Sequence, residues 1–135
     1  MRQQTEDLIR RYYAAFNARD WAGMLKCVSE DVIHDVNQGG RHSGKAHFSS
    51  FLAHMDQCYR EELREIVIMS CPDGAHGSAE FVVHGTYLAT DEGLPPAKRQ
   101  NYVLPAGAFF AVKNGLIARV STHYNLKDWM AQVGG

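Results

Sequence analysis

Apolar residues recur at helical spacing in the first part of the chain. In residues 3–18 they lie three and four positions apart, which predicts an amphipathic helix with one buried face. Two further helices are predicted over residues 21–28 and 45–59, the first of them after Asp20, whose carboxylate suits a helix N-cap. A short helix over residues 126–133 ends the pattern.

Strand patterns dominate the second part of the chain. Residues 78–90 alternate between apolar and polar side chains, which predicts a strand with one buried face. Asn114-Gly115 is a typical hairpin turn between two such segments. The predicted strands are residues 32–36, 63–71, 78–90, 100–113 and 116–125. This order predicts an α+β domain with helices on one face of a curved antiparallel sheet.

Composition narrows the possible partners. The 135 residues fit one domain, and 14 Lys and Arg against 15 Asp and Glu leave a net charge of −1. Such a balance argues against nucleic-acid and membrane-surface partners. The longest uncharged stretch, residues 100–112, is shorter than the roughly 20 residues of a membrane helix. Three cysteines without a CxxC pair indicate reduced thiols in a cytoplasmic protein.

Five segments carry motifs of a known family. They are RRYYAAFNARDWAGM, EDVIHDV, RHSGKAHFSSFL, GTYLATDEGLPPAKR and NGLIARVSTHYNLKDWMAQVG. In this order they resemble the ketosteroid isomerase and SnoaL-like polyketide cyclase branch of the nuclear-transport-factor-2-like superfamily. The resemblance implies one SnoaL-like domain over residues 1–135. It also implies a cone-shaped, cystatin-like roll in which three N-terminal helices and a strongly curved antiparallel sheet enclose an apolar cavity.

The resemblance further implies a carboxylate base in that cavity and a tyrosine that stabilises the enolate oxygen. Counting back from Ser43-Gly44 places Asp35 at the base, whereas counting forward without a gap places Val36 there. A one-residue gap favours Asp35, and Tyr12 matches the tyrosine donor. In the ungapped register His34 lines the cavity instead, because neighbours on a strand face opposite sides.

Alternation and resemblance together predict the lining of the cavity. The residues are Phe16, Met55, Phe81, Val83, Tyr87, Val103, Phe109, Val120 and Tyr124, with Asn125 as a further substrate contact. Two positions depart from the family pattern, since Gly107 and Asn125 stand where the isomerase and cyclase branches have acids. These departures keep a second interpretation open, a non-catalytic protein that binds a small hydrophobic ligand.

The sequence therefore predicts a cofactor-independent isomerase or cyclase that transfers protons on a small hydrophobic carbonyl compound, steroid-like or polyketide-like. Asp35 would be the base and Tyr12 the donor, with His34 assisting. We expect no metal, because the histidines lack HxH or HxxxH spacing, and no cofactor, because P-loop and GxGxxG motifs are missing. A homodimer through the outer face of the sheet is expected.

Overall fold

The computed structural model describes residues 1–37 and 39–134. Within these residues the helices are α1 (Arg2–Asn17), α2 (Trp21–Lys26), α3 (Lys45–Cys58) and α4 (Leu126–Gly134). The strands are β1 (Val28–Asp35), β2 (Arg41–Ser43), β3 (Tyr59–Ser70), β4 (His76–Tyr87), β5 (Asn101–Lys113) and β6 (Leu116–Tyr124). The predicted elements are all present, and β2 is an additional short strand.

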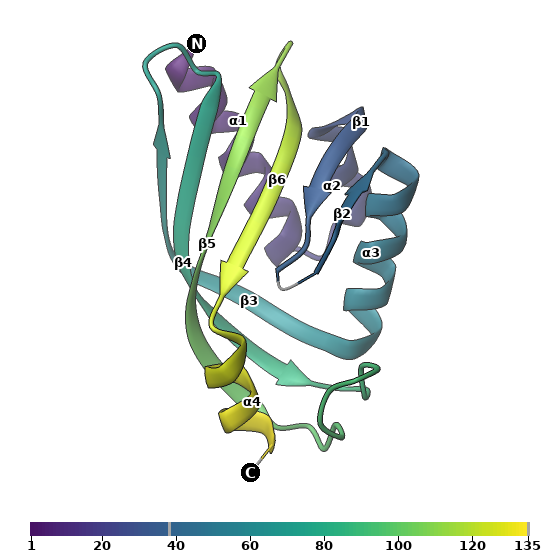
Figure 1. The fold of residues 1–135 in the computed structure, drawn as a ribbon. Helices are drawn as coiled ribbons and strands as arrows, with labels where there is room; N and C mark the ends of the chain where they lie inside the picture. Colours follow the sequence, from purple (N-terminus) through teal and green to yellow (C-terminus); the bar gives the residue numbers. More distant parts are fainter. Residues whose placement is uncertain (38, 135) are drawn as a thin grey trace.

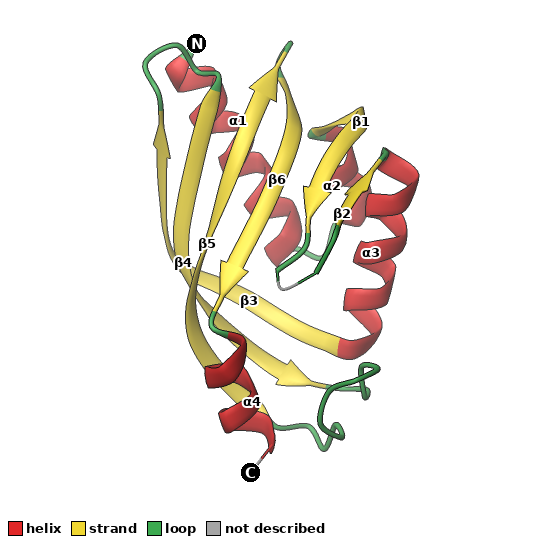
Figure 2. Ribbon diagram, viewed as in Figure 1, coloured by secondary structure: helices red, strands yellow, loops and turns green. Residues whose placement is uncertain are grey.

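The strands form one strongly bent sheet in the order β2-β1-β6-β5-β4-β3 (Figure 1). Neighbouring strands are antiparallel except β1 and β6, which run parallel. Helices α1, α2 and α3 lie on the concave side, and α4 packs at the end of the sheet where β6 finishes (Figure 2). The predicted α+β class with a curved sheet is confirmed.

Two local sequence signals have the expected structural outcome. The side chain of Asp20 accepts a hydrogen bond from the backbone N–H of Gly23 at 2.9 Å, which caps α2. Asn114 and Gly115 adopt φ of +53° and +76°, the left-handed conformations that a tight hairpin between β5 and β6 requires.

Strand β3 begins at Tyr59, four residues before its predicted start, and directly follows α3. Glu61 and Leu63 lie on the same face as Tyr59, because side chains two apart on a strand share a face. The register then shifts between Arg64 and Val67, where the intervening Glu65 adopts φ of +54°. This bulge reverses the alternation, so that Val67 becomes exposed on the other face.

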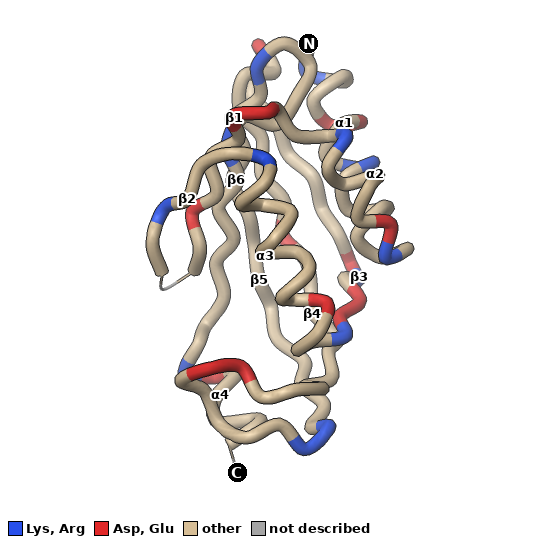
Figure 3. The backbone as a smooth tube through the Cα atoms, turned by 90° about the vertical axis from the view of Figure 1, so that its right-hand side faces the viewer, with Lys and Arg blue, Asp and Glu red and all other residues tan. Residues whose placement is uncertain are grey.

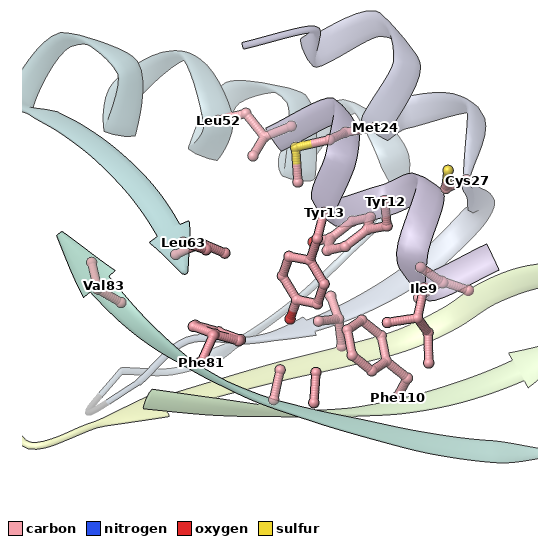
Figure 4. Packing of buried hydrophobic residues seen from close by; sticks show 14 of the residues in the cluster. Ile9, Tyr12, Tyr13, Met24, Cys27, Leu52, Leu63, Phe81, Val83 and Phe110 are labelled. Carbon is pink, nitrogen blue, oxygen red and sulfur yellow. The ribbon is translucent and has the colours of Figure 1, made fainter. Parts of the chain in front are cut away.

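An aromatic cluster joins α1 to the concave face of the sheet (Figure 4). Tyr12 and Tyr13 pack edge-on against Phe110 with ring centroids 5.7 and 5.9 Å apart, and Tyr13 also contacts Phe81 at 5.1 Å. All four rings are buried. Such tilted and edge-to-face contacts fix the position of α1 above the sheet.

Charged residues of both signs are interspersed along the chain (Figure 3). Among the described residues, the helices do not have the length and hydrophobicity needed to cross a membrane. Neither observation identifies a partner.

Candidate functional site

A pocket of about 400 Å³ lies between the helices and the concave face of the sheet. Most of its lining is apolar and aromatic, including Phe16, Trp21, Phe48, Phe51, Leu52, Met55, Phe81, Val83, Leu104 and Trp129. This size and lining suit a small hydrophobic molecule. A few polar side chains reach the same space, and their arrangement decides what the pocket can do.

Glu61 brings a carboxyl group from β3 into this lining. The hydroxyl of Tyr102, on β5, donates a hydrogen bond to Glu61 Oε2 at 2.6 Å. Burial raises the pKa of Glu61, and the hydrogen bond from Tyr102 offsets part of that increase. The pKa of Tyr102 is also raised, by burial and by the neighbouring carboxylate, so its phenol stays protonated.

A glycine makes the contact between Tyr102 and Glu61 possible. Gly85 on β4 pairs with Glu61 on one side and with Tyr102 on the other. A Cβ atom at Gly85 would overlap the ring and hydroxyl of Tyr102. The ring therefore lies flat over the backbone of β4 and extends its hydroxyl to the carboxylate of β3.

A second polar group lines the pocket where α3 ends. The hydroxyl of Tyr59 donates to Asp91 Oδ2 at 2.7 Å, and His54 Nε2 lies 2.8 Å from Asp91 Oδ1. Burial alone would raise the pKa of Asp91, but the hydrogen bonds from Tyr59 and His54 together hold it below its ordinary value. Asp91 therefore stays ionised at neutral pH.

Tyr124 lines the same pocket as both carboxylates. It is half-buried on β6 and lines the pocket. Burial raises the pKa of its phenol, and the negative charges of Glu61 and Asp91 raise it further. Tyr124 is thus a protonated donor in the same pocket as Glu61.

His34 lines the pocket from β1 and is buried among aromatic rings. Its imidazole packs edge-on against Phe48 and Phe51 with centroids 5.1 and 4.4 Å apart. Burial, with a smaller effect of the nearby His42, lowers the pKa of His34 to about 4. The ring is therefore neutral at physiological pH and can donate one N–H and accept at its other nitrogen.

Comparison with known proteins identifies the family. A model of the SnoaL-like domain matches residues 9–120. The chain belongs to the SnoaL-like family. No curated protein shows a significant sequence match to it.

Crystal structures that share more than half of their residues with this SnoaL-like chain include two candidate polyketide cyclases. A candidate polyketide cyclase from Pseudomonas putida KT2440 is 57% identical, with 96% of this chain and 97% of that chain covered and a TM-score of 0.95. A candidate polyketide cyclase from Silicibacter sp. TM1040 is 56% identical over 98% and 97% of the two chains, with a TM-score of 0.96. An NTF2-like protein from Burkholderia xenovorans LB400, 13% identical over 98% of both chains with a TM-score of 0.78, shares the fold. The predicted family resemblance and the NTF2-like fold are confirmed.

The predicted position of Asp35 in the SnoaL-like pocket is wrong. Its carboxylate accepts two hydrogen bonds from Arg41, at 2.6 Å to Oδ1 and 2.9 Å to Oδ2, and lies outside the pocket lining. Asp35 pairs with Ser121, which in turn pairs with the exposed Phe109. His34 is the residue that turns inward, as the ungapped register requires. The hydrogen bonds from Arg41 hold the pKa of Asp35 below its ordinary value.

Most of the other predicted pocket residues are in place. Those that line the pocket are Tyr12, Phe16, Met55, Phe81, Val83 and Tyr124. Two predictions on β5 are wrong, because the other set of alternating residues faces the pocket. Val103 and Phe109 are 50% and 56% exposed on the outer face. Leu104 and Phe110 turn inward, so their immediate neighbours turn outward. Gly107 lies on the outer face for the same reason, opposite Glu80.

Three of the predicted contacts do not line the pocket. Tyr87 is fully buried and donates from its hydroxyl to the carbonyl of Pro95 at 2.7 Å, which holds the loop after β4. Val120 is core. Asn125 is exposed, and its side-chain oxygen accepts from the backbone N–H of Asp128 at 3.1 Å at the start of α4.

Among the polar pocket residues that were not predicted from the sequence are Glu61, Tyr102, Tyr59, Asp91 and His54. Extending the predicted strand back from Leu63 would have found Tyr59 and Glu61. They lie four and two residues before Leu63, so their side chains point to the same face of β3. Asp91 lies in the loop between β4 and β5, where no periodicity applies.

Proposed function

We propose that this SnoaL-like protein is a cofactor-independent acid–base enzyme that moves a proton on a small hydrophobic carbonyl compound of polyketide-like or steroid-like type. One observation carries the proposal, the carboxyl of Glu61 in an apolar pocket with its pKa raised by burial. A carboxylate with a raised pKa is a stronger base than an ordinary glutamate. The description of close relatives as candidate polyketide cyclases supports the same reaction class.

In the proposed reaction Glu61 replaces Asp35 as the base. Its carboxylate removes a proton from the carbon next to the carbonyl, and the electron pair of the C–H bond moves to the carbonyl oxygen as an enolate. The proton then either returns from Glu61 to a different carbon of a conjugated enolate, or the enolate carbon attacks a second carbonyl carbon, which closes a ring and leaves an alkoxide that takes the proton from Glu61. The first outcome is an isomerisation and the second a cyclisation.

The developing enolate needs hydrogen-bond donors. Tyr102 already donates to Glu61 and so orients the base. Tyr124 and Tyr12 line the pocket with pKa values raised by burial, so both phenols keep their protons and can donate to the oxygen. Neutral His34 supplies a further N–H. This retains the role predicted for Tyr12 and the assisting role of His34.

Exchange of ligand protons with solvent tests the proposal directly. We expect the wild-type protein to exchange the α-protons of 2-tetralone, a bicyclic ketone, in D₂O, as measured by NMR. Glu61→Gln should lower the exchange rate about 100-fold or more while leaving ketone binding in place. Glu62→Gln is the matched control, because Glu62 is the exposed neighbour on the same strand.

The alternative, a non-catalytic ligand-binding protein, predicts a different result. The wild-type protein would then be thermally stabilised by the ketone, yet exchange its α-protons no faster than Glu61→Gln.

We further propose that two copies associate through the outer face of the sheet in the cytoplasm. Apolar side chains are exposed there on two strands, namely Val67 and Met69 of β3 and Val103 and Phe109 of β5. The free thiols of all three cysteines suit a reducing compartment. Phe109→Asp should convert a dimer into a monomer in light scattering. A wild-type protein with the mass of one chain would reject this association.

A further inference from the structure

Three donor side chains of different chemistry converge at the end of α3. His54 Nε2, Cys58 Sγ and a carboxylate oxygen of Asp91 all lie within 4.8 Å of one another. His54 and Cys58 are four residues apart on α3, so their side chains share one face of the helix. The backbone N–H of Leu88 donates to the carbonyl of Cys58 at 2.7 Å and ties the segment that leads to Asp91 to the helix end.

The arrangement differs from that of a nucleophilic cysteine. In a nucleophile–histidine–carboxylate triad the two partners bind opposite nitrogens of the imidazole ring. Here Asp91 Oδ1 and Cys58 Sγ face the same nitrogen, Nε2 of His54, at 2.8 and 4.0 Å. The ring therefore cannot pass a proton from the thiol to the carboxylate, and the three donors instead surround a common point.

We propose that His54, Cys58 and Asp91 bind a divalent transition-metal ion of the zinc class. One nitrogen, one thiolate sulfur and one carboxylate oxygen form a donor set that Zn²⁺ and Co²⁺ accept in tetrahedral geometry. With metal bonds of about 2.0 to 2.3 Å, neighbouring ligand atoms in such a site are about 3.5 Å apart. The observed separations of 2.8 and 4.0 Å bracket this value, so small side-chain rotations would form the site.

The contacts around these three residues also favour metal binding. Tyr59 donates to Asp91 Oδ2 and so leaves Oδ1 directed at His54, in the manner of residues that orient metal ligands. The side chain of His54 is half-exposed, which gives an ion access from solvent. His54 and Asp91 also line the pocket, so a fourth coordination position next to it could take water or an oxygen of a bound molecule.

Cobalt spectroscopy of the full chain, freed of metals with a chelator, tests the site. We expect Co²⁺ to bind in a ratio of one per chain, with tetrahedral ligand-field bands and a near-ultraviolet thiolate-to-cobalt band. Cys58→Ser should remove the near-ultraviolet band, and His54→Gln should weaken binding at least 10-fold. Cys71→Ser is the matched control, because Cys71 is an exposed thiol outside the cluster.

The same titration can overturn the assignment. Absence of a one-to-one complex would do so, as would a thiolate band that disappears in Cys71→Ser and persists in Cys58→Ser. His42 and His47 stack with ring centroids 4.7 Å apart on the surface and could hold an adventitious ion. Binding that is lost in His42→Gln/His47→Gln and retained in His54→Gln would place the metal there and reject the site at α3. Circular dichroism of each variant identifies any that fail to fold, and His54→Gln, at a half-exposed position, is the variant least sensitive to folding.

Discussion

Two carboxylates on opposite faces of the same sheet have opposite electrostatic environments. Glu61 faces the apolar pocket, where burial raises its pKa and its hydrogen-bond donor is the neutral phenol of Tyr102. Asp35 faces outward, where a bidentate contact with the Arg41 guanidinium lowers its pKa. The first group gains basicity and the second loses it. The direction in which a strand residue faces therefore decides whether its carboxyl can act as a base.

The largest expected effect separates these two carboxylates by activity. Asp35→Asn should leave ketone proton exchange within about twofold of wild type, whereas Glu61→Gln should lower it about 100-fold or more. The reason is that Asp35 lies outside the pocket, while Glu61 lines it. Exchange rates measured side by side by NMR check this. A large loss in Asp35→Asn with full activity in Glu61→Gln would reverse the assignment.

A pair of glycines extends the comparison to stability. Gly85→Ala should destabilise the fold by about 1–3 kcal/mol, because the added methyl group overlaps the Tyr102 ring on the inner face. Gly107→Ala should change stability by no more than about 0.5 kcal/mol, since its Cβ would meet only the carbonyl oxygen of Ala79 at 3.2 Å. Urea denaturation measures both. Equal losses in the two variants would show that Tyr102 is not held tightly against β4.

The smallest expected effect is a pair of opposite pH trends. The raised pKa of Glu61 means that folding binds its proton, so this group stabilises the fold at low pH and the contribution is lost as pH rises through the folded-state pKa. The lowered pKa of Asp35 contributes stability above the unfolded-state pKa, and that contribution is lost as pH falls through the folded-state pKa. The second trend is weaker because Asp35 is partly exposed.

Thermal unfolding over a series from about pH 3, below an ordinary aspartate pKa, to about pH 8, well above an ordinary glutamate pKa, measures these trends. The melting temperature of Glu61→Gln relative to wild type should rise with pH, and that of Asp35→Asn should fall. Parallel trends in the two variants would mean that both carboxyls experience the same environment.

The order of elements could be predicted from the sequence because helical spacing and strand alternation are strong in this chain. The residues of the site were harder to predict, because an error of one residue in the register of a strand turns the wrong side chain toward the pocket. The one-residue gap assumed in β1 predicted that Asp35 faces the pocket, whereas His34 does. In β5 the alternation was assigned to the wrong set of residues, so Val103 was predicted to line the pocket in place of Tyr102. A strand start placed at Leu63 left Glu61 outside the predicted sheet.

Other features depend on tertiary contacts that no local pattern encodes. Asp91 meets His54 and Tyr59 only because the loop between β4 and β5 returns to the end of α3. The spacing of His54 and Cys58 was visible in the sequence, yet a search for histidine pairs does not find a histidine followed four residues later by a cysteine. Acidic partners from distant segments become apparent only once the chain is folded.

The bulge at Glu65 has a consequence for comparing this chain with its relatives. Before the bulge the odd-numbered residues of β3 face the pocket, and after it the odd-numbered residues face the outer side of the sheet. An insertion or deletion there would turn one half of the strand inside out, even if every residue type were preserved. Alignments should therefore be anchored separately on each half, and a shared glutamate should be counted from α3 rather than from the hairpin that follows Ser70.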